Sequence, residues 1–106
     1  HLKALYTLTK SLDPTRPVID NDGWEHTDMT DLFGIHDYAK TGELLVAKYR
    51  RLGQPGAGVP DNARAALAPG FQYNGSPVFL SEFGGISYIA PGSTPPEGAW
   101  GYAGLE

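Results

Sequence analysis

The fold of this chain is decided by residues 77–85, which read Pro-Val-Phe-Leu-Ser-Glu-Phe-Gly-Gly. Residues 78–81 have the length and apolar character of a short buried strand, and Pro77 suits its first position, where no backbone donor is needed. Glu82 follows at once, and the two glycines after Phe83 allow the backbone to bend away with positive φ. An acid at the carboxyl end of a buried parallel strand is where β/α barrels keep their catalytic groups. The alternative is a Glu82 carboxylate that is merely solvated.

The composition is that of a small globular protein with many loops. The chain has 106 residues, of which 41% are hydrophobic, and it contains 14 glycines and 9 prolines. These two residue types usually make up about 12% of a protein, so we expect much of the chain to be irregular. No apolar run approaches the roughly 20 residues that a membrane helix requires. We therefore predict no membrane partner.

Charge and motifs argue against several other classes of protein. The net charge is −4 and no basic stripe occurs, so nucleic acid is not an expected partner. The sequence has no cysteine, no phosphate-binding glycine motif and no Gly-x-Ser-x-Gly nucleophile. His26 with Asp28, and His36 with Asp37, lack further ligands at metal-binding spacing, so we predict neither a metal nor a cofactor.

Three helices are predicted from periodicity and end signals. Leucines recur every three or four residues over residues 2–12, which indicates an amphipathic helix that ends at Asp13, before a proline. Thr41 suits the cap of a second helix over residues 42–52. Residues 61–67 are expected to form a third, short helix.

Three strands are predicted from short apolar runs at residues 17–19, 32–35 and 78–81. Fully apolar strands suit a sheet that is buried on both faces, and such a sheet is usually parallel. The first two runs are closer than the dozen or so residues that a parallel crossover needs, so residues 23–31 should hold at most a turn or two of helix. The order of elements indicates one α/β unit over residues 1–106.

Three segments together resemble the catalytic barrel of glycoside hydrolase family 2, the family of β-galactosidases, β-glucuronidases and β-mannosidases. They are Leu-Asp-Pro-Thr-Arg-Pro-Val at residues 12–18, Asp-Leu-Phe-Gly-Ile-His-Asp-Tyr-Ala at 31–39, and the stretch at 77–85. They occur in the family's order and at compatible spacing. The resemblance implies a partial TIM (β/α)8 barrel, in which the predicted strands are the fifth to seventh. Residues 1–106 would then be a C-terminal portion of that barrel.

The resemblance also implies catalytic roles. Glu82 stands where the family has its nucleophile, and Tyr38 where the family has a tyrosine that donates a hydrogen bond to it. The implied function is part of a retaining β-glycosidase, which forms a covalent glycosyl-enzyme on Glu82. The family's acid/base is the Glu of an Asn-Glu pair, which this sequence lacks, so it is expected upstream of His1. The isolated chain should then be inactive. Its expected partner is the rest of the parent barrel, or a second copy of the chain that binds through open sheet edges.

Polar and aromatic residues near the predicted strands are candidates for binding a carbohydrate. Aromatic rings stack on the apolar faces of sugars, and a few placed polar groups fix their orientation. For each residue the alternative is a local role in its own loop, through Asx-turns, caps or ordinary packing. The candidates are Asn21, Asp22, Trp24, His36, Asp37 and Trp100.

Other functions stay open at this level. A non-catalytic carbohydrate-binding module would use the aromatic side chains as a binding face. A structural or interaction domain would not bring Tyr38 to Glu82. An inverting hydrolase would place its second acid, Asp22 or Asp37, about 6.5–9.5 Å from Glu82, compared with about 5 Å in a retaining enzyme.

Overall fold

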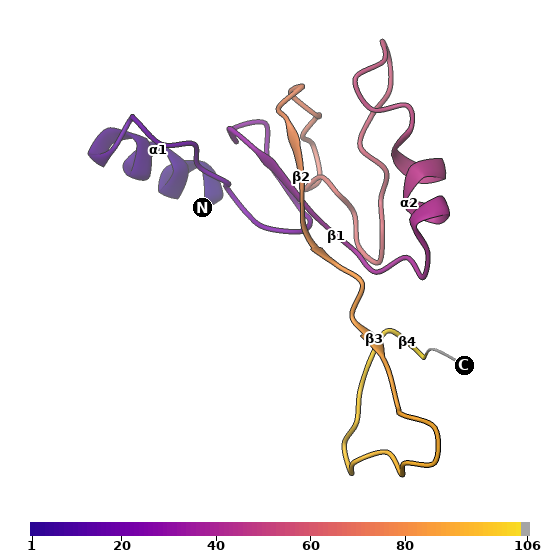
Figure 1. Ribbon diagram of the computed structural model, residues 1–106. Coiled ribbons are helices and arrows are strands. Elements are labelled where there is room, and N and C mark those ends of the chain that lie inside the picture. Colours follow the sequence, from indigo (N-terminus) through magenta and orange to yellow (C-terminus); the bar gives the residue numbers. More distant parts are fainter. Residues whose placement is uncertain (105–106) are drawn as a thin grey trace.

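The computed structural model describes residues 1–104, which form two helices and four short strands. The four strands pair into two parallel two-stranded sheets, β1 with β2 and β3 with β4. In Figure 1, α1 and α2 lie on opposite sides of the β1–β2 pair, and the loop that joins β3 to β4 projects away from it. The elements are α1 (Leu2–Leu12), β1 (Phe33–Asp37), α2 (Gly42–Tyr49), β2 (Val78–Phe83), β3 (Ile86–Ser87) and β4 (Ala103–Gly104).

The crossover from β1 through α2 to β2 agrees with the mixed α/β class and with the predicted parallel pairing. Both strands run two residues beyond the apolar runs that predicted them, so Glu82 lies inside the end of β2. Thr41 caps α2 as expected, because its side chain accepts a hydrogen bond from the Leu44 amide. The helix ends at Tyr49 instead of Leu52, where the chain continues as a turn. The partial TIM barrel stays a prediction.

A β-bulge in β2 sets the direction of its last residues. Ile35 pairs with Leu80, but the next residue of β1, His36, pairs with Glu82, so Ser81 is the extra residue of the bulge. A bulge bends its strand, increases the local twist and redirects the side chains that follow. The bulge thus brings Glu82 level with His36 at the end of the sheet.

The core is small and lies where β1 meets the segments on either side of it. Phe33 and Ile35 of β1 are buried together with Ala66, and the His26 ring lies 4.0 Å from the Phe33 ring between centroids. Because alternate residues of a strand share a face, Phe33 and Ile35 bring β1 into this cluster twice. The partly buried residues around it are Tyr49, Val59, Leu67, Tyr73, Val78 and Leu80.

Side chains cover the edge of β1 that faces away from β2. The Gly34 carbonyl lies 2.7 Å from Nε2 of His26, and the His36 carbonyl accepts a hydrogen bond of 2.9 Å from the Asn62 amide. His26 also lies 2.6 Å from Asp20 through Nδ1, and both of these side chains are fully buried. A buried imidazole and an amide therefore take the place that a neighbouring strand would fill.

The predicted strand at residues 17–19 is wrong. Both backbone groups of Val18 bond to Asp31: its amide to the Oδ2 atom and its carbonyl to the amide. These bonds tie the segment to a loop, so it forms no strand ladder. The same Asp31 carboxylate accepts hydrogen bonds from Tyr6 and Lys10 of α1.

The predicted helix at residues 61–67 is also wrong. The amides of Glu25 and His26 donate to the carbonyls of Ala65 and Ala66, so this segment is held extended by backbone pairing. The Asp61 carboxylate accepts a hydrogen bond from the Ala66 amide, five residues on, which is too far along the chain for a helix cap. Tertiary pairing here overrides a local helix signal.

The described part of the chain is extended, with much apolar surface open to solvent. Its radius of gyration is 17.1 Å, whereas a compact domain of this length has about 13 Å. Leu5, Leu8 and Leu12 of α1 are exposed, as are Phe79 and Phe83 of β2. No helix within residues 1–104 is long and apolar enough to cross a membrane.

Candidate active site

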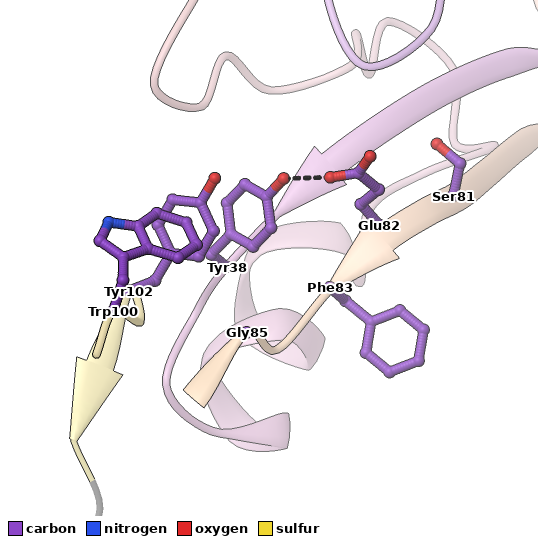
Figure 2. Close-up of a pocket in the computed structure, with 7 residues that line it drawn as sticks. All are labelled: Tyr38, Ser81, Glu82, Phe83, Gly85, Trp100 and Tyr102. Atoms are coloured by element: carbon purple, nitrogen blue, oxygen red, sulfur yellow. Dashed lines mark hydrogen bonds between the residues drawn. The ribbon is translucent and has the colours of Figure 1, made fainter. Parts of the chain in front are cut away.

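Tyr38 and Glu82 meet at the carboxyl ends of the two paired strands. Tyr38 follows β1 directly, and Glu82 is the penultimate residue of β2. The Tyr38 hydroxyl donates a hydrogen bond to Oε2 of Glu82, and Figure 2 shows the two groups pointing at each other. Residues that are 44 positions apart in the sequence therefore meet through this hydrogen bond, while their catalytic roles stay a prediction.

The carboxylate keeps Tyr38 in its protonated, donating form. The hydrogen bond to Glu82 raises the pKa of the Tyr38 hydroxyl well above its ordinary value of 10.0, and the neighbouring Tyr102 hydroxyl raises it further. An ionised Tyr38 would lose the donated bond and place two negative charges together. A tyrosine is already protonated at neutral pH, and the raised pKa extends the donating form of Tyr38 to more alkaline pH.

An open pocket of about 460 Å³ surrounds this pair. The Glu82 side chain is 54% exposed, so its carboxylate is accessible from the pocket instead of being buried in the sheet. Tyr38 and the aromatic residues of the 86–104 segment stand beside it (Figure 2). The lining residues are Tyr38, Ser81, Glu82, Phe83, Gly85, Trp100 and Tyr102.

A row of aromatic rings forms one wall of the pocket. The Tyr102 ring stacks on the Tyr38 ring with 3.5 Å between centroids and 14° between planes. Trp100 packs edge-on against Tyr102 and is 72% exposed. Gly85 makes this packing possible, because its φ is +63° and an added Cβ would lie 2.7 Å from the Tyr102 ring. The predicted positive φ after the acid is thus confirmed at Gly85.

A second cavity of about 360 Å³ adjoins the first and shares Tyr38 and Tyr102 with it. Trp24 and His36 form part of its lining, with ring centroids 4.9 Å apart and an angle of 73° between the rings. The Arg64 guanidinium lies over the Trp24 ring, 5.1 Å from its centroid. Trp24 therefore contacts both His36 and Arg64 on the rim of the site.

His36 lies between two carboxylates. Its Nδ1 is 3.5 Å from Oε2 of Glu82, and its Nε2 is 3.4 Å from Oδ2 of Asp22. The Ser81 hydroxyl donates a hydrogen bond of 2.6 Å to the other oxygen of Asp22. Within residues 1–104, Nε2 of His36 is the one buried side-chain polar atom without a hydrogen-bond partner. The structure therefore gathers Asp22 and His36, two of the predicted binding residues, around Glu82.

Asp37 and Asn21 serve local structure instead. Burial favours a raised pKa for the Asp37 carboxyl, but hydrogen bonds from Lys48, Tyr49 and the Ala39 amide outweigh it and hold that pKa below its usual range. Both Asp37 oxygens are used, so this side chain joins β1 to α2. The Asn21 amide donates to the Trp24 carbonyl within its own loop. Sugar binding by either residue stays a prediction that their contacts do not favour.

Several pocket residues escaped the sequence reasoning. Tyr102 lies in a segment without periodicity, and its only signal was the neighbouring Trp100, two residues earlier. Ser81 carries no signal for its hydrogen bond to Asp22, because the bulge at this position leaves no mark in the sequence.

Neither a metal-binding cluster in the described residues nor a related protein helps to identify the function of this site. Across residues 1–104, no three His, Asp or Glu side chains gather closely enough to hold a metal ion. No protein-family model, curated protein sequence or solved structure gives a significant match to the chain. The resemblance to glycoside hydrolases accordingly rests on the residues of this sequence alone.

Proposed function

We propose that this chain supplies the nucleophile side of a retaining β-glycosidase active site, with Glu82 as nucleophile and Tyr38 as its hydrogen-bond donor. One observation carries the proposal: the Tyr38 hydroxyl bonds to an accessible Glu82 carboxylate at the carboxyl ends of adjacent parallel strands. Those strand ends are where β/α barrels keep their chemistry. A solvated glutamate at a strand end would not require a dedicated tyrosine donor.

The proposed reaction forms a glycosyl-enzyme on Glu82. One carboxylate oxygen attacks the anomeric carbon, and the bond from that carbon to the glycosidic oxygen breaks with its electron pair. A second carboxyl group protonates the leaving oxygen and later takes a proton from the water that releases the sugar. The Tyr38 hydrogen bond holds the Glu82 carboxylate in place before the attack and costs no reorganisation during it.

The second carboxyl group is not evident near Glu82. Asp22 lies across the His36 ring from Glu82, and the Asp37 carboxylate is directed toward α2. By the family resemblance, the acid/base comes from an Asn-Glu pair, which this sequence does not contain. We therefore propose that the chain by itself does not turn over substrate and acts together with the remainder of a parent barrel.

The aromatic residues around Glu82 fit a carbohydrate substrate. Trp100 and Tyr102 present exposed ring surface beside the carboxylate, and Trp24 lines the adjoining cavity. Aromatic faces pack well against the apolar C–H surface of a sugar ring. We propose that these rings orient the sugar over Glu82.

Covalent trapping of the intact parent protein tests the nucleophile. A 2-deoxy-2-fluoro β-glycoside with a good leaving group should add one sugar to the protein, and peptide mass spectrometry should place it on Glu82. Glu82→Gln should abolish labelling and lower turnover of an aryl β-glycoside by about 10⁴-fold or more, because the attacking oxygen is lost. The control Glu43→Gln removes an exposed carboxylate of α2 and should keep normal rates. Label on any other residue would reject the assignment.

The alternative is a carbohydrate-binding surface without catalysis, which the exposure of Trp100 favours. Under this alternative, the parent protein binds a sugar reversibly and Trp100→Ala weakens that binding, while Glu82 never becomes labelled. Reversible binding without a covalent adduct, measured by calorimetry and mass spectrometry on one sample, would favour it over the hydrolase.

A further inference from the structure

The contacts around His36 describe a built arrangement of side chains, and its role is not explained by the nucleophile and the tyrosine alone. Only 12% of the His36 side chain is exposed, and each ring nitrogen faces a different carboxylate. Nδ1 approaches Glu82 on the side of Oε2, the same oxygen that accepts the Tyr38 hydrogen bond. The Tyr38 hydroxyl, as a hydrogen-bond donor, and the His36 ring, at 3.5 Å, therefore both lie against one oxygen of the proposed nucleophile.

Two glycines make room for this arrangement. An added Cβ at Gly23, whose φ is +88°, would lie 2.7 Å from Cγ and Nδ1 of the His36 ring. An added Cβ at Gly34 would lie 2.2 Å from Oδ1 of Asp22. Gly34 and His36 are two positions apart in β1 and share a face of the strand, so the Asp22 carboxylate rests on Gly34 directly beside the imidazole.

Further contacts fix both ends of the arrangement. The Asn62 amide donates a hydrogen bond to the backbone carbonyl of His36, and the Trp24 and His36 rings pack edge-to-face. The Ser81 hydroxyl holds Asp22 through a hydrogen bond of 2.6 Å, and Ser81 is the bulge residue directly before Glu82. The contacts therefore run from Ser81 to Asp22, from Asp22 to His36, and from His36 to Glu82, which directly follows Ser81 in β2.

We propose that His36 is a positioning residue for the Glu82 nucleophile, held in orientation by Asp22 so that its Nδ1 keeps Oε2 in place. This inference rests on the proposed function and deepens it. Among residues 1–104 no group donates a hydrogen bond to Oε1 of Glu82, so Oε1 is the oxygen left free to attack the anomeric carbon. The 3.5 Å separation between Nδ1 and Oε2 is typical of a catalytic contact that tightens when substrate binds.

Two near-isosteric substitutions separate the two ring nitrogens. Asparagine carries its amide nitrogen close to the position of Nδ1, while glutamine carries its amide close to that of Nε2. In the intact parent protein, His36→Asn should keep the rate of covalent trapping by the fluoro-glycoside within about 5-fold of the wild type. His36→Gln and His36→Ala should lower it by about 10- to 100-fold, the size of effect expected when a reacting group is misplaced by about 1 Å.

Asp22 supplies an independent measurement. Asp22→Asn keeps an acceptor for the Ser81 hydroxyl but removes the charge that faces Nε2. It should slow trapping in the wild-type background and add no further loss to His36→Ala, because residues that act through one another are not additive. Melting temperatures of all variants are measured alongside.

The outcomes separate this inference from the proposed function. If the wild-type protein is labelled on Glu82 but Asn and Gln at position 36 lose equal rate, or the losses follow the melting temperatures, His36 is merely structural and the inference fails alone. If additive losses appear in the double variant, the role of Asp22 fails. If label is found on a residue other than Glu82, the proposed function fails and the inference falls with it.

Discussion

At the scale of single residues, the site is an exposed carboxylate with two ordered neighbours. Glu82 accepts a hydrogen bond from the Tyr38 hydroxyl and lies 3.5 Å from Nδ1 of His36. Both groups lie at Oε2, and the hydrogen bond to the carboxylate raises the pKa of the Tyr38 hydroxyl further above neutral pH. The side chain of Glu82 is therefore restrained although more than half of it is exposed.

The Tyr38 hydroxyl is tested by Tyr38→Phe, which keeps the ring stacked on Tyr102 and removes only the donor. In the intact parent protein, kcat on an aryl β-glycoside should fall by about 10²-fold, the size typical for loss of one preorganised donor. Tyr6→Phe is the matched control. It removes the hydrogen bond that Tyr6 of α1 donates to the Asp31 carboxylate, outside the pocket. Equal rates in the two variants would show that the hydroxyl of Tyr38 has no catalytic role.

At the scale of elements, the end of β1 is tied to α2 through one buried carboxylate. Asp37 is the last residue of β1 and is only 3% exposed, and it accepts hydrogen bonds of 2.7 Å from both Lys48 and Tyr49 of α2. Tyr38, the next residue, is in this way placed at a fixed point after the strand. The hydrogen bonds between Asp37 and α2 thus fix the backbone position from which the Tyr38 side chain reaches Glu82.

Replacing this carboxylate measures the strength of the joint. Asp37→Asn should lower the free energy of unfolding by about 2–3 kcal/mol, because Lys48 loses a charged acceptor in a largely buried place. The matched control Asp28→Asn breaks the exposed pair between Asp28 and Lys3 and should cost less than about 1 kcal/mol. Denaturant unfolding followed by circular dichroism makes the comparison, and losses of equal size would contradict the structural role of Asp37.

At the scale of the whole molecule, polar contacts hold together what a small core cannot. Three apolar side chains are buried within residues 1–104, and α1 is attached through Tyr6 and Lys10 to Asp31 while three of its four leucines face solvent. The loop before β1 depends on Asp20, which is bonded to Thr27 and His26. Carboxylates therefore carry much of the tertiary structure.

This dependence on carboxylates predicts acid sensitivity. Burial acts to raise the pKa of Asp20, but hydrogen bonds from Thr27 and His26 outweigh it and lower that pKa below the ordinary 3.8. A lowered pKa stabilises the folded state fully above about pH 4, and this contribution is lost as the pH falls through the folded-state value. Asp20→Asn should therefore cost about 2 kcal/mol at pH 7 and progressively less below pH 4.

Urea unfolding at pH 7, 5 and 3 checks this prediction. The gap in unfolding free energy between the wild type and Asp20→Asn should narrow toward pH 3. For Asp28→Asn the gap should be small at every pH, because Lys3 also lowers the pKa of the Asp28 carboxyl but the pair is exposed and contributes little. A gap that stays constant over this range would show that the Asp20 charge does not stabilise the fold.

The sequence predicted what depends on local patterns and missed what depends on pairing between distant segments. The leucine spacing predicted α1, the Thr41 signal predicted α2, and short apolar runs predicted β1 and β2. The failures at residues 17–19 and 61–67 have one cause: the backbone of each segment bonds to a loop that is remote in sequence. Glu82 was predicted from its place after an apolar run together with the family resemblance, and Tyr38 from that resemblance, whereas the contacts of Tyr102 and Ser81 emerge only after the strands are paired.

The covered edge of β1 has a consequence for how this chain joins other strands. An incoming strand on that side has to displace the His26 imidazole from the Gly34 carbonyl and the Asn62 amide from the His36 carbonyl. Strand addition there is accordingly a competition against two preformed bonds and requires rearrangement of the preceding loop. For this reason, the His26 and Asn62 side chains would have to move before the sheet could extend beyond β1, whether into a larger barrel or into an aggregate.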